Sequence, residues 1–260
     1  MQRIFIKLKN KLAGILTLIV IIILFIITCL LSAEWVKYHS VRVTSYDSKN
    51  IDVMREPVQK LYKYEIAKSK IFKYKSLKKN ITAKIKPVAY YKISGLVIAH
   101  NTYFPEKDGF DYIALYDIGI VWNKLAKNDF YKNNCKAKSE QVIIDGLFPH
   151  MGNGRVLNAW CINHDETLKK IGYNWLDFDN HVSHTHIIPA NRNIIAALNT
   201  IKNYDVVEIE GELVNVEVDG EFQERISSLE RTDDNGSALG GGACEIMYVT
   251  KVKIGHNVYQ

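Results

Sequence analysis

The sequence predicts an α+β protein, in which an N-terminal transmembrane helix precedes a mainly antiparallel β domain with one prominent helix. Residues 12–33 carry no charged side chain, β-branched and aromatic runs recur across residues 81–254, and helical periodicity is clearest after Asn191. Such runs, separated by turn residues, are typical of antiparallel sheets. A small barrel of the OB type is the most economical version of this arrangement.

The apolar run at residues 12–33 is long enough to cross a bilayer. About 20 residues at roughly 1.5 Å each match a hydrocarbon core of about 30 Å. Arg3 and three lysines precede the run, whereas Lys37 and Arg42 are the basic residues that follow closely. The positive-inside rule therefore predicts a cytosolic tail at residues 1–11 and a non-cytosolic remainder.

A cleaved signal peptide is the alternative interpretation of this N-terminus. Its apolar region is normally shorter, and Leu31-Ser32-Ala33 is a poor cleavage site. We therefore expect an uncleaved anchor in a bacterial inner membrane, with the C-terminal domain in the periplasm. Residues 34–60 have little periodicity and are interpreted as a stalk, and residues 61–260 as the β-rich domain.

Positive charge is concentrated near the predicted anchor. The formal net charge is +6, and residues 55–86 carry eleven Lys or Arg against two glutamates. Lysines near a membrane can contact anionic headgroups, but alternation with apolar residues also fits a solvated face. The block lacks a specific combination of stacking and basic residues, so we expect no nucleic-acid partner.

The first half of the β domain predicts two strands and a short helix. Residues 88–99 are rich in β-branched and aromatic residues, with Gly95 as a bulge or bend. A second strand is expected over residues 113–122. Asn123 can cap a helix that continues to Lys132.

The second half has clearer signals. Asn191 or Asn193 can cap a helix whose apolar residues recur at helical spacing as far as Ile201. The other predicted elements are a strand over 205–218 that bends near Gly211, a return strand over 221–230 after the turn Asp219-Gly220, and a final strand over 244–254.

The cysteines indicate one disulfide. Cys29 lies in the apolar run, so three of the four cysteines face the outer compartment, where oxidising conditions would pair two of them. Cys135 and Cys161 flank a loop-rich connection. Cys244 opens an apolar run in which a buried thiol can pack as a small hydrophobe. We therefore predict a bond between Cys135 and Cys161.

Four motifs stand out in the C-terminal half: His186-Ile187-Ile188-Pro189-Ala190, Gly211-Glu212-Leu213-Val214, Ser227-Ser228-Leu229-Glu230-Arg231-Thr232-Asp233 and Gly242-Ala243-Cys244-Glu245. Together they resemble a family of uncharacterised bacterial membrane-anchored or exported proteins. The resemblance covers roughly residues 72–252 and implies domain limits and a bacterial origin, but no activity. Tyr204 and the lengthened loop at 237–241 depart from the family pattern.

Histidines form the densest group of possible ligands. His184-x-His186 is similar to the start of metallo-hydrolase sites, in which alternating imidazoles share a metal. The Asp-His continuation of that pattern is missing here, because Ile188-Pro189 follows. We therefore expect no metal and no other cofactor. A metal-dependent hydrolase using His181, His184 and His186 stays the alternative function.

Polar residues near the C-terminus are the predicted binding residues: His186, Arg231, Asp233 and Glu245. Ser227-Ser228 lacks the Gly-x-Ser-x-Gly elbow of a hydrolase, so no catalytic residue is assigned. The run that starts at Asp233 lacks the alternating ligands of a calcium loop. Asp117 is interpreted as a turn-capping residue beside a core Trp122.

These observations favour a binding protein over an enzyme. The predicted function is a single-pass, membrane-anchored envelope protein that acts as a non-enzymatic binding or assembly module. A sheet edge or the polar loop would engage another envelope protein. The oligomeric state is left open.

Overall fold

The computed structural model describes residues 15–30, 42–63, 68–75, 80–103, 109–142, 154–219, 224–229 and 244–260. Contacts divide the chain into two units, residues 1–41 and residues 42–260.

The first unit contains an α-helix over residues 15–30, whose side chains are all exposed. None of the helices in the described ranges combines the length and the apolar character needed to cross a membrane. The predicted cytosolic tail and the outer ends of the predicted span, residues 12–14 and 31–33, lie outside the described residues.

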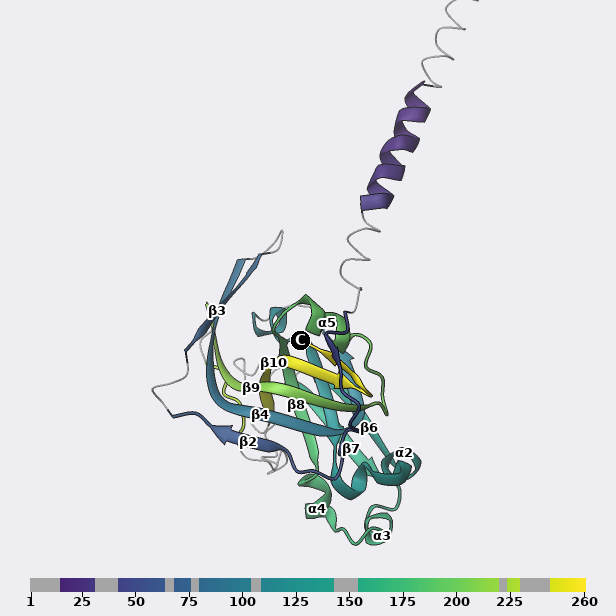
Figure 1. Cartoon of the computed structure of the whole chain (residues 1–260), viewed down its shortest axis with the longest axis vertical. Coiled ribbons are helices and arrows are strands. Elements are labelled where there is room, and N and C mark those ends of the chain that lie inside the picture. Colours follow the sequence, from purple (N-terminus) through teal and green to yellow (C-terminus); the bar gives the residue numbers. More distant parts are fainter. Residues whose placement is uncertain are drawn as a thin grey trace, which may run out of the picture. The chain divides into compact units, whose positions relative to one another are not determined.

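The second unit is a mainly antiparallel sheet with a few short helices, which confirms the predicted fold class at this level (Figure 1). Its strands are β1 (Ser45–Tyr46), β2 (Val58–Leu61), β3 (Lys70–Lys75), β4 (Asn80–Thr102), β5 (Tyr116–Val121), β6 (Cys135–Val142), β7 (Gly154–Cys161), β8 (Val182–Pro189), β9 (Val206–Val218), β10 (Glu245–Ile254) and β11 (Asn257–Tyr259). The α-helices are α2 (Phe130–Asn134), α3 (His164–Lys169), α4 (Trp175–Asp179) and α5 (Arg192–Leu198), and the 3-10 helices are η1 (Phe110–Tyr112), η2 (Asn123–Leu125) and η3 (Lys127–Asp129).

Five strands pair in a closed circuit. β4 pairs with β5, β5 with β8, β8 with β10, β10 with β9, and β9 with β4. The β8–β10 pair is parallel and the other four are antiparallel. Strand β4 reaches two partners because it is long and bent, with register shifts between Pro87 and Ala89 and between Val97 and Ala99 (Figure 1). Closure pairs the strand edges that an open sheet would expose.

Two glycines allow close backbone approaches in this circuit. A Cβ at Gly95 would lie 2.3 Å from the carbonyl oxygen of Val121, and one at Gly211 would lie 2.1 Å from that of Tyr248. Real Cβ atoms cannot approach a backbone oxygen so closely. Beyond Gly211, strand β9 is buried on both of its faces, because the neighbouring residues Leu213 and Val214 point to opposite faces and both are fully buried. The sequence predicts that this strand bends near Gly211.

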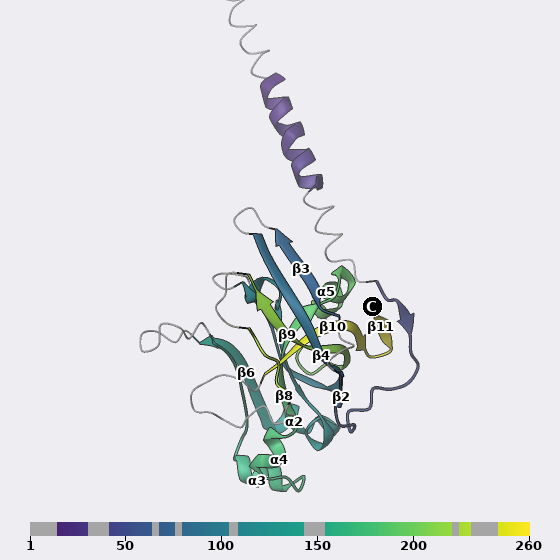
Figure 2. The ribbon, with the colours of Figure 1, turned by 90° about the vertical axis from the view of Figure 1, so that its left-hand side faces the viewer.

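Helices cover the two ends of the sheet. In both views, α2, α3 and α4 gather at one end and α5 lies at the other (Figures 1 and 2). Leu125, Leu168 and Phe178 pack with Tyr131 in a core under the first group. Asn191 caps α5, its side-chain oxygen accepting from the amides of Asn193 and Ile194 at 2.9 and 3.0 Å. The predicted helix is therefore confirmed, and its cap is Asn191.

The predicted helix from Asn123 to Lys132 is wrong as one element. Asn128 and Asp129 have φ of 53° and 54°, in the left-handed region, so the segment breaks into η2, η3 and α2. Asn123 does not cap this segment. Its side-chain amide donates to Glu56 at 3.1 Å instead.

The predicted stalk also needs correction, because residues 42–60 belong to the second unit. β1 pairs with β11, and β2 pairs with β4. The buried Lys253 ammonium lies 2.6 Å from the Asp47 carboxylate and donates to the Lys49 carbonyl at 2.7 Å. Residues 34–41 lie outside the described residues.

The predicted return strand is described in part. Residues 220–223 and residue 230 lie outside the described residues. Within residues 224–229, Arg225 forms a single antiparallel bridge to Val216. The final predicted strand is confirmed as β10.

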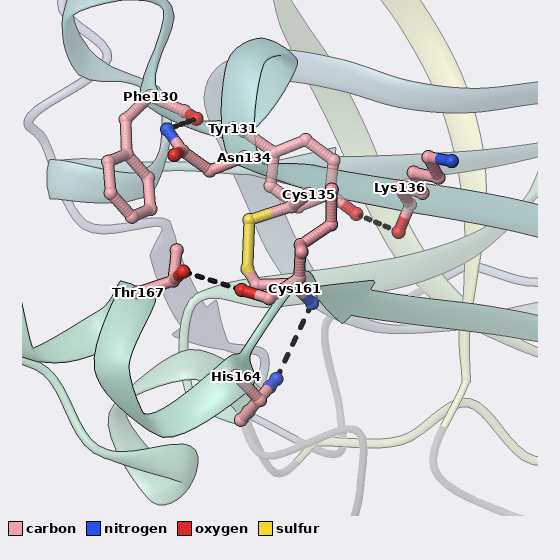
Figure 3. Close-up of a disulfide and its surroundings, with 9 residues drawn as sticks. Phe130, Tyr131, Asn134, Cys135, Lys136, Cys161, His164 and Thr167 are labelled. Atoms are coloured by element: carbon pink, nitrogen blue, oxygen red, sulfur yellow. Dashed lines mark hydrogen bonds between the residues drawn. A yellow bond between two sulfur atoms is a disulfide. The ribbon is translucent and has the colours of Figure 1, made fainter.

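Strands β6 and β7 form a separate antiparallel ribbon. The predicted disulfide between Cys135 and Cys161 is present at one end of this ribbon. Cys135 and Cys161 lie directly opposite each other with their sulfur atoms 1.99 Å apart (Figure 3). Beside the bond, the Tyr131 hydroxyl donates to the Lys136 carbonyl at 2.8 Å, and the Cys161 amide donates to His164 Nδ1 at 3.4 Å. The disulfide thus ties β6 to β7 next to the helix α2.

Candidate functional site

A buried polar cluster lies on one face of the neighbouring strands β5 and β8. Asp117 is directly opposite His186 in the antiparallel register, and His184 follows two residues away on the same face of β8. The Asp117 side chain is fully buried, and the two imidazoles are 6% and 13% exposed. Side chains at alternate positions of a strand share a face, so the His-x-His spacing places both rings beside one carboxylate.

Asp117 contacts both histidines. Its Oδ1 lies 2.6 Å from His186 Nδ1, and its Oδ2 lies 3.5 Å from His184 Nε2. The two imidazole rings meet edge to face, with centroids 5.0 Å apart. One carboxylate therefore orients two imidazoles by opposite ring nitrogens.

Arg155 of β7 completes the inner side of the cluster. Its guanidinium, 4% exposed, donates to Asp117 at 3.1 Å, to the Ala114 carbonyl at 2.8 Å, and to Asp111 of η1. It also lies over the Tyr103 ring, 4.0 Å from the centroid. Such multiple donation is suited to an arginine, whose planar group presents several N–H donors at fixed angles.

The charge states of this cluster follow from burial and contacts. Burial by itself would raise the pKa of the Asp117 carboxyl, but His186, a hydrogen bond from His184 and the Arg155 guanidinium hold that pKa well below its usual range. Burial lowers the pKa of His186 against the opposing effect of Asp117. The Asp117 carboxylate therefore stays ionised in its buried position.

Cys244 joins the cluster from the chain that enters β10. The parallel register places Glu245 opposite Thr185 and Ile246 opposite His186, so the preceding residue reaches the level of His184. The Cys244 sulfur lies 3.2 Å from His184 Nδ1. One ligand atom from each of His184, His186 and Cys244 lies within 4.8 Å of the others.

His181 does not belong to this cluster. Its ring contacts the Asp177 carbonyl at 2.6 Å through Nδ1 and lies near the Tyr173 hydroxyl at 3.3 Å through Nε2. The structure therefore brings together two of the three histidines of the alternative hydrolase and adds a cysteine in place of the third.

Glu245, predicted as a binding residue with His186, lies on the opposite face of the sheet. It is 3% exposed, and its carboxylate accepts from the Tyr91 and Ser183 hydroxyls at 3.2 Å each. These partners place the Glu245 side chain inside the strand circuit. Arg231 and Asp233, the other two predicted binding residues, lie outside the described residues.

Ser227 and Ser228 position the entry to β10. The Ile246 amide donates to the Ser227 hydroxyl at 3.0 Å, and the Ser228 amide donates to the Cys244 carbonyl at 3.1 Å. The pair therefore holds the backbone on either side of Cys244 and Glu245, which agrees with the absence of a hydrolase elbow in the sequence.

The central residue of the cluster, Asp117, is not among the predicted binding residues. Asp117 was interpreted as a turn-capping residue beside Trp122, but it lies within β5, and the Trp122 indole donates to Glu56 at 2.9 Å. A signal was present, because an aspartate inside an otherwise apolar strand must have a buried partner. Nothing in the sequence indicated that Arg155 is that partner.

Comparison of the chain with protein-family models, with curated protein sequences and with solved structures gives no match. The chemistry of the cluster is therefore inferred from its own geometry.

Proposed function

We propose that this protein is a single-pass, membrane-anchored envelope protein whose barrel is a binding module of the OB type. Three features support the OB assignment. In chain order the five strands of the circuit are β4, β5, β8, β9 and β10, and the first of them, β4, pairs with β5 and with β9. The third strand, β8, is parallel to the fifth, β10, and the helix α5 connects β8 to β9. An OB barrel has five strands in a Greek-key arrangement.

The observation that carries the proposal is the position of the polar cluster. OB barrels bind ligands on the face of their second and third strands, between the loops that follow the first and the fourth strands. Here the second and third strands are β5 and β8, which carry Asp117, His184 and His186. Arg231 and Asp233 follow the fourth strand, β9, in the sequence. This position supports the proposal that the predicted binding residue His186 belongs to the ligand site.

We infer that the ligand is a segment of another envelope protein that carries a carboxylate. Arg231 would bind this group with its guanidinium, because a planar pair of N–H donors matches two carboxylate oxygens. The region beyond the predicted span has a net charge of about +2, since four of the six net positive charges precede it. This weak overall charge suits a specific local contact better than broad electrostatic attraction.

The proposed anchor places the module in the periplasm. The helix over residues 15–30 exposes large apolar side chains along its length, including Ile21, Leu24 and Phe25 at 57%, 58% and 68%. A continuous exposed apolar surface marks a membrane or protein contact. The excess of basic residues before this helix supports a cytosolic N-terminus.

Site-specific photocrosslinking in living cells tests the binding function. A photoreactive amino acid at Ile226, which is 66% exposed beside the entry to β10, should form an adduct with an envelope protein. The same amino acid at Trp175 of α4, 60% exposed, is the control and should form none. Arg231→Ala with Asp233→Ala should abolish the Ile226 adduct. Equal adducts at both positions, or an adduct that survives the double substitution, would contradict the proposal.

A metal-dependent hydrolase is the second candidate function. The observation that favours it is the approach of His184, His186 and Cys244 to within 4.8 Å of one another. This function needs a bound metal and a substrate that reaches it, whereas the binding function needs neither. Turnover that depends on added metal and is lost with His186→Ala would favour the hydrolase.

A further inference from the structure

The three groups that approach one another beside Asp117 have the donor chemistry of a soft metal site. His184 and His186 offer imidazole nitrogens from alternate positions of β8, and Cys244 offers a thiolate from the neighbouring strand end. Two adjacent parallel strands hold the three donors, so their spacing depends on the strand register. Thiolate with imidazole selects zinc over magnesium and calcium, which prefer oxygen ligands.

Asp117 supplies the outer support that metal-binding histidines usually have. Such a histidine donates its second ring N–H to a carboxylate, which fixes the tautomer and the ring orientation. Asp117 contacts His186 through Nδ1 at 2.6 Å and His184 through Nε2 at 3.5 Å. The remaining nitrogens are Nε2 of His186 and Nδ1 of His184. The latter already faces the Cys244 sulfur at 3.2 Å.

The surrounding charges also favour a cation. Two buried carboxylates, Asp111 and Asp117, both contact the guanidinium of Arg155. A thiolate at Cys244 would add a further negative charge near the same rings. A divalent cation held between the thiolate and the imidazoles would offset this charge where solvent cannot.

We propose that His184, His186 and Cys244 bind one Zn²⁺ ion, with Asp117 as the outer carboxylate hydrogen-bonded to His186. Three protein ligands leave the fourth tetrahedral position to water or to a ligand group, as in catalytic rather than structural zinc sites. The inference is independent of the binding function, because the crosslink at Ile226 requires no metal. It differs from the expectation, drawn from the sequence, that the protein binds no metal.

Metal analysis of the full-length protein in detergent tests the site. After loading with Zn²⁺ and dialysis, the wild type should retain about one zinc per chain. His184→Ala and Cys244→Ala should retain none. The chain offers matched controls of the same residue types: His181→Ala and Cys29→Ala should retain zinc as the wild type does. Asp117→Asn keeps all three ligands and should weaken zinc binding about 10- to 100-fold.

Cobalt substitution makes the test independent of whether a variant folds. Co²⁺ bound to the wild type should show the charge-transfer band of a cobalt–thiolate bond, and Cys29→Ala should show the same band. A wild-type protein that binds no zinc and shows no such band would overturn the proposal. Rapid alkylation of Cys244 in that protein would indicate a reactive thiol paired with His184 instead. Zinc that persists in Cys244→Ala would also refute this ligand set.

Discussion

Asp117 organises the polar cluster because its two carboxylate oxygens contact different histidines while Arg155 neutralises its charge. Such a group is stable in a buried position when every strong donor near it is used. Removing Arg155 would leave two carboxylates, Asp111 and Asp117, without their shared cation. Arg155 and Asp117 therefore form an ion pair that positions the imidazole rings. The two imidazoles and the Cys244 thiol supply the possible metal ligands.

His100, which lies on β4 opposite Ile118 of β5, provides a pH-dependent contribution to stability. Its Nε2 is buried and has no hydrogen-bond partner within the described residues, and its ring stacks on Tyr116 with centroids 5.9 Å apart. Burial lowers the pKa of His100 below its ordinary value of 6.5. Below about pH 6.5 the unfolded chain therefore takes up a proton that the folded protein resists, so stability falls as the pH falls.

The substitution His100→Phe should reduce this pH dependence. Phenylalanine keeps a ring against Tyr116 and removes the titrating group. Between pH 7.5 and pH 5.5, the wild type should lose up to about 1 kcal/mol more unfolding free energy than the variant. Urea unfolding followed by tryptophan fluorescence at the two pH values measures the difference. Identical pH dependence in the two proteins would show that His100 does not titrate differently on unfolding.

At the scale of elements, the β6–β7 ribbon links the disulfide to the cluster. The bond joins one end of the ribbon, whereas Arg155 near the start of β7 reaches Asp117. Leu157, between them on β7, lies over Gly119 of β5, where a Cβ would approach its side chain to 2.8 Å. The ribbon therefore rests on the strand that carries Asp117 and brings an arginine to it.

Removing the disulfide should destabilise this ribbon. The double substitution Cys135→Ala and Cys161→Ala opens a loop with a sequence separation of 26 residues. A loop of this size corresponds to a loss of about 2–4 kcal/mol of unfolding free energy, measured by urea unfolding. Reduction of the wild type should reproduce most of the loss and should leave the double variant unchanged. A variant as stable as the oxidised wild type would show that the ribbon holds without the bond.

At the scale of the whole molecule, the chain consists of an apolar helix and a β unit that starts at residue 42. Pairing of β1 with β11 and the contact between Asp47 and Lys253 attach the start of the β unit to its last strands. Residues 42–60, which the sequence assigned to a stalk, are therefore part of the β unit.

Topology reporters test the proposed anchor and its orientation. A reporter enzyme that is active only outside the cytosol should be active when fused after Gln260, and one that is active only in the cytosol should not. The physical reason is the basic tail of residues 1–11, which the positive-inside rule retains in the cytosol. Carbonate extraction should leave the protein in the membrane pellet. The opposite reporter pattern would invert the orientation, and release by carbonate would contradict the anchor.

Local signals in the sequence determined several elements before any tertiary contact was considered. The apolar repeat after Asn191 and Asn193 predicted α5, with either asparagine as its cap, and the structure selects Asn191. The β-branched runs predicted β4, β9 and β10. Gly95 and Gly211 were predicted as bend positions, and both lie where the backbones approach closely. These signals depend on the backbone preferences of single residues and on side-chain periods of 2 and 3.6 residues, which neighbours along the chain largely decide. The pairing of Cys135 with Cys161 was predicted because these cysteines flank a loop-rich connection and Cys244 opens an apolar run, and the structure contains this bond.

The tertiary structure decided which residues form the candidate site. Asp117, Arg155, His184 and Cys244 come from four segments. Strand register brings Asp117, His184 and Cys244 together, and packing of the separate β6–β7 ribbon on β5 adds Arg155. Asp117 looked like a turn residue because its partner Arg155 is 38 positions away in the sequence. Cys244 looked like a packing residue because the parallel pairing of β8 with β10 carries no local signal. Pairing between distant strands depends on the burial and closure of the whole circuit, and no segment of the sequence specifies it by itself.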